Sequence, residues 1–189
     1  MNRKEYIQRT LQLGVCSCAM LLPGPVKASS VIKTDEDEQT KMLRMQRDFL
    51  QNWLADFMEA ADREVDAITR VKLYESTGRG CYNRHKFKQD IAEKGKGDLD
   101  KLIEAYKQNF EIWKEGDKIH IRYGEVNAQC YCPAAKSHDP KPNDIHCECT
   151  RTTHQTIFET ALCKPVKVNI LESFRRGGKT CHFLVEIIS

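Results

Sequence analysis

The spacing of apolar residues changes once along this chain of 189 residues, and that change limits the folds open to it. Between residues 42 and 113 apolar side chains recur at steps of three and four, which is typical of amphipathic helices. From Lys118 they alternate with polar residues, as they do in half-buried strands. A helical segment at 150–162 then precedes two more alternating segments. We therefore predict an α+β fold, with N-terminal helices packed on a small antiparallel sheet and one helix between two β-hairpins.

The N-terminal helical region is expected to divide at its glycines. The acidic run at 35–38 suits a helix start, and the apolar stripe that follows, 42–68, is predicted to be core. Gly78 and Gly80 are expected to end this helix, and a short helix at 82–93 follows. Asp98 is expected to cap the next helix, whose apolar face runs from Leu99 to Trp113.

Two hairpins are expected after these helices. The first pairs the strand at 118–123 with residues 126–132 across Gly124. A loop with three prolines, 133–146, then leads into the last helix. The second hairpin pairs 166–174 with 181–188.

The charge balance argues against a polyanionic partner. Lys plus Arg number 30 and Asp plus Glu number 27, a formal charge of +3 that is evenly spread, so no nucleic-acid partner is expected. Neither a GxGxxG motif nor a P-loop is present, which leaves nucleotide chemistry of those types without support. A hydrophobic fraction of 40% beside 30% charged residues excludes both a disordered chain and a multi-span membrane protein.

The first 28 residues are typical of an export signal. A basic start precedes an apolar run at 11–22, and Ala28 offers a small residue before a cleavage point. The start resembles a twin-arginine motif with Lys4 in place of the second arginine. We predict a signal peptide at 1–28 and a single domain at 29–189, exported to the periplasm. A buried N-terminal helix is the alternative, and a lipoprotein-like cleavage box would instead leave a lipid anchor at Cys18 on the periplasmic side of the membrane.

Six cysteines form the candidate metal site of the mature chain. Two C-x-C pairs flank the proline-containing loop, and four converging thiolates are what zinc accepts in a tetrahedral site. Both pairs are expected to be extended, so that both side chains of a pair can serve one centre. The candidate Zn²⁺ ligands are Cys130, Cys132, Cys147 and Cys149, with Cys181 and Cys81 near enough to join them.

Disulfides are the competing interpretation of these cysteines. An exported chain meets an oxidising compartment, where one C-x-C pair can bridge crosswise to the other. Cys163 is expected to be a small core residue. His146 is a substitute ligand, although a lone loop histidine is more often solvated.

The segment from His146 to Ile188 resembles a known family pattern. It contains the Cys147-x-Cys149 pair before a helix, a strand at 164–168, the pair Glu172-Ser173 and a closing strand with Cys181. This pattern is similar to the vinyl-reductase-type hydrocarbon-binding domains and to the related L-2-amino-thiazoline-4-carboxylic acid hydrolase family. The resemblance implies binding of a small, apolar ligand.

Sensor members of that superfamily hold zinc with three cysteines and a glutamate. The resemblance places the first of these cysteines at Cys147 and the last at Cys181. The middle cysteine falls on Ser173 and the glutamate on Ile170, neither of which suits zinc. Cys130, Cys132 and Cys149 would then have to supply the missing ligands.

Three functions follow from these patterns. The first is a small-molecule-binding domain braced by a cysteine centre, in which the ligand would occupy an apolar concavity. The second is a hydrolase with a cysteine nucleophile or zinc-activated water, for which only His154 and His182 offer a nearby base in the sequence. The third is a thiol-redox role.

Overall fold

The computed structural model describes residues 34–124 and 130–188 of the chain. The predicted export signal at 1–28, including Cys18, lies outside the described residues. The chain divides into two compact units, Met1–Thr40 and Lys41–Ser189, and the sheet with its covering helices belongs to the second. None of the helices in the described residues is long and apolar enough to cross a membrane.

Helices lead into the sheet, as the periodicity predicts. The chain forms α2 (Thr34–Glu64), α3 (Ala67–Arg84), α4 (Lys86–Lys94) and α5 (Leu99–Lys107), then β1 (Glu111–Glu115) and β2 (Lys118–Arg122). A short 3₁₀ turn, Pro133–Ala135, precedes α6 (Cys147–Leu162). The chain closes with β3 (Val166–Glu172), a second 3₁₀ turn at Phe174–Arg176, and β4 (His182–Ile187).

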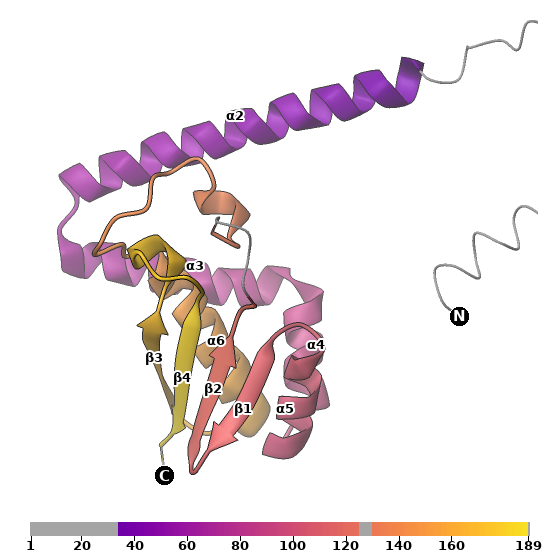
Figure 1. Cartoon of the computed structure of the whole chain (residues 1–189), viewed down its shortest axis with the longest axis vertical. Coiled ribbons are helices and arrows are strands. Elements are labelled where there is room, and N and C mark those ends of the chain that lie inside the picture. The colour runs from indigo at the N-terminus through magenta and orange to yellow at the C-terminus, as the bar shows by residue number, and fades with distance from the viewer. Residues whose placement is uncertain (1–33, 125–129, 189) are drawn as a thin grey trace, which may run out of the picture. The chain divides into compact units, whose positions relative to one another are not determined.

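The four strands form one antiparallel sheet in the order β1-β2-β4-β3. Pairing of β2 with β4 joins the two hairpins, and α6 lies between them in the chain, so the predicted α+β architecture is confirmed. Figure 1 shows α6 behind the sheet, with α4 and α5 beside it.

One face of the sheet supplies most of the core. Alternate residues of the strands point inward, and Ile157 and Phe158 of α6 pack against them. The buried strand residues are Ile112, Ile119, Ile121, Val166, Val168, Phe183 and Val185. The opposite face carries Trp113, His120 and His182, so the sheet is apolar on one side and largely polar on the other.

The N-terminal helices differ from the prediction in where they divide. The long helix ends at Glu64, and Asp66 begins α3 by accepting a hydrogen bond from the Thr69 amide at 3.0 Å. Gly78 and Gly80 lie inside α3 rather than ending it. Gly78 is needed for packing, since a Cβ there would lie 2.4 Å from the Cys149 carbonyl oxygen.

The apolar stripe of α2 was predicted to be core, and that prediction was wrong. Phe49 is 70% exposed, and of the large apolar side chains in α2 only Met58 is buried. The sequence period is helical, but nothing in the described part of the chain covers this face. The exposed side chains are Met42, Leu43, Met45, Phe49, Leu50, Trp53 and Phe57.

Two further elements differ from the expectation. Trp113 lies on β1 and not on a helix, because the chain leaves α5 at Lys107 and pairs back against β2 across Gly116. The first hairpin is therefore β1–β2 rather than 118–132, and residues 125–129 are not described. The cap at Asp98 is confirmed, since its carboxylate accepts hydrogen bonds from the amides of Asp100 and Lys101.

Candidate thiol centre

The six candidate cysteines come from four separate segments. Cys81 lies on α3, Cys130 and Cys132 precede the loop, Cys147 and Cys149 open α6, and Cys181 directly precedes β4. All six are free thiols, buried or half-buried, so the crosswise disulfide of the competing interpretation is not formed in this structure. No three of the described cysteine sulfurs lie within 4.8 Å of one another.

The second C-x-C pair is helical, contrary to the expectation of an extended segment. The helix begins at Cys147 because Asp144 accepts a hydrogen bond from the His146 amide at 2.8 Å and turns the chain there. Residues two apart on a helix point to nearly opposite sides. Cys147 and Cys149 therefore face different neighbours.

Cys147 faces the sheet. Its sulfur lies 2.9 Å from the Ser173 hydroxyl. Burial, opposed by the Ser173 hydroxyl and aided by the nearby Cys181, raises the pKa of the Cys147 thiol to about 12. The resemblance had placed two ligand positions at Cys147 and Ser173, and the structure brings these two residues into contact.

Cys149 faces α3. Burial raises the pKa of the Cys149 thiol, the adjacent Thr77 hydroxyl lowers it, and Cys81 raises it again. Cys81 in turn accepts a hydrogen bond from the Lys88 ammonium at 2.8 Å. The thiols of α3 and α6 thus meet across the contact that Gly78 makes possible.

Cys130 and Cys132 lie between these two groups. Burial raises the pKa of the Cys132 thiol to about 11, and both Cys130 and Cys149 add to the increase. Cys130 likewise raises the pKa of Cys181, after burial, which has the larger effect. The six thiols therefore form one neighbourhood with two sides, Cys81–Cys149–Cys132 toward α3 and Cys147–Cys181 toward the sheet, with Cys130 between them.

A buried arginine holds the loop that joins the two C-x-C pairs. Arg175 is 1% exposed and donates to the Asp144 carboxylate at 2.8 Å. Its remaining donors reach the loop carbonyls of Ala135, His138 and Asp139 and the Nδ1 atom of His138. All five N–H groups are used, so the loop is folded around the guanidinium.

From the sequence, Arg175 is expected only in the connection between the last two strands. A basic residue in a hairpin connection ordinarily points to solvent, and no spacing in the sequence marks its partner Asp144. The only local signal is the neighbouring pair Arg175-Arg176 before two glycines. That signal does not distinguish a buried arginine from an exposed one.

Two histidines near the centre are buried and neutral. His146 was expected to be solvated, but burial lowers its pKa to about 4, and neither ring nitrogen has a hydrogen-bond partner among the described residues. His154 lies between the hydroxyls of Tyr106, 3.2 Å from Nδ1, and Tyr123, 3.1 Å from Nε2. Burial lowers the pKa of His154 to about 3, so it serves the core and is a poor general base.

Cys163 was expected in the core and is exposed instead. It ends α6 in the left-handed conformation, φ 52°, which turns its side chain away from the helix face. Cys163 lies outside the group of six thiols and is exposed, so its substitution is a natural control for the centre.

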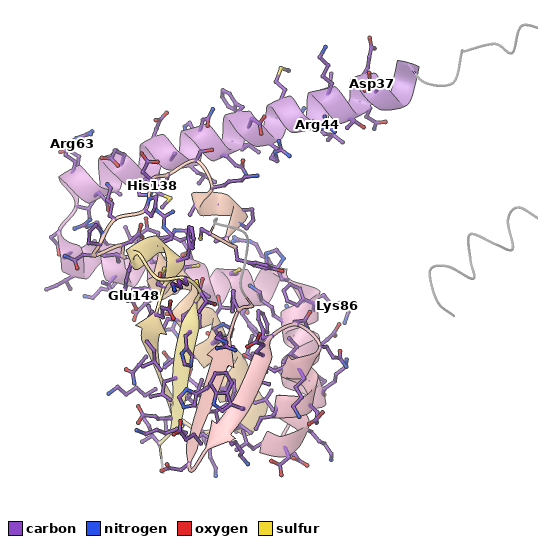
Figure 2. The ribbon with its side chains drawn as sticks, in the orientation of Figure 1. Asp37, Arg44, Arg63, Lys86, His138 and Glu148 are labelled. Carbon is purple, nitrogen blue, oxygen red and sulfur yellow. The ribbon has the colours of Figure 1, made fainter. Side chains whose placement is uncertain are left out.

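A second cluster, Glu59, Asp62 and His138, does have the spacing of a metal site, unlike the thiols. Their ligand atoms lie within 4.8 Å of one another, and Figure 2 shows His138 on the side of the loop that faces α2. However, the Lys141 ammonium already bonds to both carboxylates, at 2.7 and 2.9 Å.

The protonation of His138 also disfavours a metal in this cluster. Its Nδ1 lies 2.6 Å from Arg175 Nη2, which can only donate. Nδ1 therefore accepts, which places a proton on Nε2, the atom that faces Glu59 at 3.3 Å. We interpret these residues as an ion-pair network that ties α2 to the loop.

Comparisons with known proteins identify a family and one similar fold. A family model described as "Family of unknown function (DUF6144)" matches residues 26–189. A search of curated proteins finds no match. The structure is similar to a trafficking protein particle complex subunit 3 from Naegleria fowleri, with a TM-score of 0.52 at 10% identity, covering 77% of this chain and 97% of that one.

A second solved structure is a vinyl-4-reductase family protein from Methanocaldococcus jannaschii. It matches with a TM-score of 0.32 at 15% identity, over 55% of this chain and 66% of that one. A likeness at this level does not show a shared fold. Membership in the vinyl-reductase-type superfamily therefore stays a prediction.

Proposed function

This chain belongs to the DUF6144 family, and we propose that it is a small-molecule-binding domain whose buried thiols hold a zinc ion. The observation that carries the proposal is the gathering of Cys81, Cys132 and Cys149, with Cys130 adjoining, on the α3 side of α6. Four thiolates complete a tetrahedral zinc site.

The surroundings of these thiols support a metal. Burial raises the pKa of the Cys132 and Cys149 thiols, so a bound cation would displace their protons and stabilise the thiolates. The Cys149 end of α6 offers the positive helix N-terminus. Zinc–sulfur bonds of about 2.3 Å would require the sulfurs to lie closer together than they do in this structure.

The expected ligand is small and apolar. The similar trafficking-complex subunit is described as covalently bound to palmitic acid, so its fold accommodates a long apolar chain. For the present chain we propose only the class of ligand, an apolar molecule, and not palmitic acid itself.

Metal analysis of the purified full chain tests the zinc centre. Cys149 and Cys147, both in the first turn of α6, provide the test variant and its matched control. We expect bound zinc, tetrahedral thiolate bands after exchange to Co²⁺, and loss of these thiolate bands in Cys149→Ser. Cys147→Ser and Cys163→Ser should retain the bands. Zinc-free protein, or thiolate bands retained in Cys149→Ser, would overturn the proposal.

A second candidate is a fatty-acyl thioester on one of the thiols, suggested by the palmitic acid of the similar structure. The intact mass of the purified chain would then exceed the sequence mass by one acyl group, and neutral hydroxylamine would remove it. A mass equal to that of the unmodified chain rejects this candidate. The hydrolase alternative gains no support from His154, because both of its ring nitrogens face tyrosine hydroxyls.

A further inference from the structure

We propose that His120 and His182 form a second metal site, on the outer face of the sheet, for a divalent transition metal that prefers imidazole. His120 Nδ1 lies 3.0 Å from His182 Nε2. His120 lies on β2 and His182 on the paired strand β4.

The sheet register produces this pairing. Arg122 lies opposite His182 and Leu184 lies opposite His120, so the two histidines are diagonal neighbours on the same face. Trp113 of β1 stacks on the His120 ring, with centroids 4.9 Å apart and planes 7° from parallel. The stacked tryptophan fixes the plane of the imidazole that would bind the metal.

The distance between the nitrogens suits a shared metal. Two nitrogens bound to one tetrahedral ion at about 2.0–2.1 Å lie roughly 3.3 Å apart. In the present structure the two rings share a proton across 3.0 Å, so a metal would replace that proton with a small change in ring position. Zn²⁺, Ni²⁺ and Cu²⁺ are the divalent ions that imidazole favours.

The charges around the pair favour a cation. His120 Nε2 lies 3.2 Å from the Glu115 carboxylate, which makes no hydrogen bond to it but adds negative charge beside the ring. Glu172 lies opposite His182 on β3. The neighbouring cation, Arg122, is paired with Glu111 at 2.6 Å.

The site is separate from the thiol centre. Cys181 precedes His182 directly, but successive residues of an extended chain point to opposite faces, and Cys181 packs against the core.

Tryptophan fluorescence provides the test because Trp113 touches the site. In the full chain carrying Trp53→Phe, Trp113 is the remaining tryptophan of the two, and Ni²⁺ should quench it saturably at one equivalent. We expect His182→Gln to weaken this quenching at least tenfold. His85→Gln, at an exposed histidine, should leave it unchanged.

The same titration distinguishes the histidine pair from the thiols. Cys149→Ser should retain the quenching, and circular dichroism should confirm that each variant is folded. Since His182 is only partly buried, its substitution is the safer variant, and His120→Gln serves as the second. Quenching that persists in folded His182→Gln, or that does not saturate, would overturn the proposal.

Discussion

At the scale of single residues, Arg175 is the side chain that holds the loop at 133–146 in its folded conformation. Its replacement by Met would leave the buried Asp144 carboxylate without its charged partner and release four loop acceptors. We expect the free energy of unfolding to fall by about 3–5 kcal/mol in urea denaturation, the cost of breaking a buried ion pair. Arg176→Met, at a partly exposed neighbour, should cost less than half as much; equal losses would contradict this role.

The buried histidines predict a pH dependence. Burial lowers the pKa of His154 to about 3 and of His146 to about 4, whereas both have an ordinary pKa near 6.5 when unfolded. Between pH 6.5 and 4 the unfolded chain binds protons that the folded chain does not. Stability should therefore fall with decreasing pH, by up to about 1.4 kcal/mol per pH unit for each histidine.

Urea denaturation between pH 7 and pH 4 measures this effect. His154→Gln can still donate to one tyrosine hydroxyl and accept from the other, but it cannot titrate. We expect it to reduce the pH slope of the unfolding free energy. An unchanged slope would show that His154 is not the titrating group.

At the scale of elements, the contact of α3 with α6 depends on one glycine. Gly-to-Ala substitutions inside exposed helices stabilise by up to about 1 kcal/mol, and Gly80→Ala should do so. Gly78→Ala should instead cost at least about 1–3 kcal/mol, because its Cβ would lie 2.4 Å from the Cys149 carbonyl oxygen and 2.9 Å from Thr152 Cβ. Thermal unfolding should therefore show a higher melting temperature for Gly80→Ala and a lower one for Gly78→Ala.

The exposed face of α2 leads to another prediction at this scale. Phe49 is 70% exposed, so Phe49→Ser should change the unfolding free energy by less than about 0.5 kcal/mol. Met58 is 5% exposed, and Met58→Ala should cost about 2 kcal/mol or more. A large loss from Phe49→Ser would show that this face is covered in solution.

At the scale of the whole molecule, we propose that the chain is exported and processed. The basic start, the apolar run at 11–22 and the small residue Ala28 support this proposal. Expressed in a bacterial host, the mature chain should begin near Ser29 or at a lipidated Cys18, as read by N-terminal sequencing. Gln at both Arg3 and Lys4 should block processing, and an intact Met1 in the unsubstituted chain would contradict export.

The sequence by itself determined the class and order of the elements. The change of period near Lys118 predicted helices before strands, and the cap at Asp98 was readable from a polar residue ahead of an apolar face. These features are local, since period and capping depend on residues a few positions apart. The same local rules placed a helix between two hairpins, and the structure confirms that order.

Only the tertiary structure decided which faces are covered and which side chains meet. An apolar stripe shows that a helix has a face but not that anything packs on it, and so α2 was wrongly predicted to be core. The cysteine spacing was visible, yet the helical turn at Cys147 directs one thiol to the sheet and its neighbour to α3. Arg175 and Asp144 are 31 residues apart, and His120 and His182 are 62 apart. Contacts at such separations arise from strand register and burial, which no short stretch of sequence encodes.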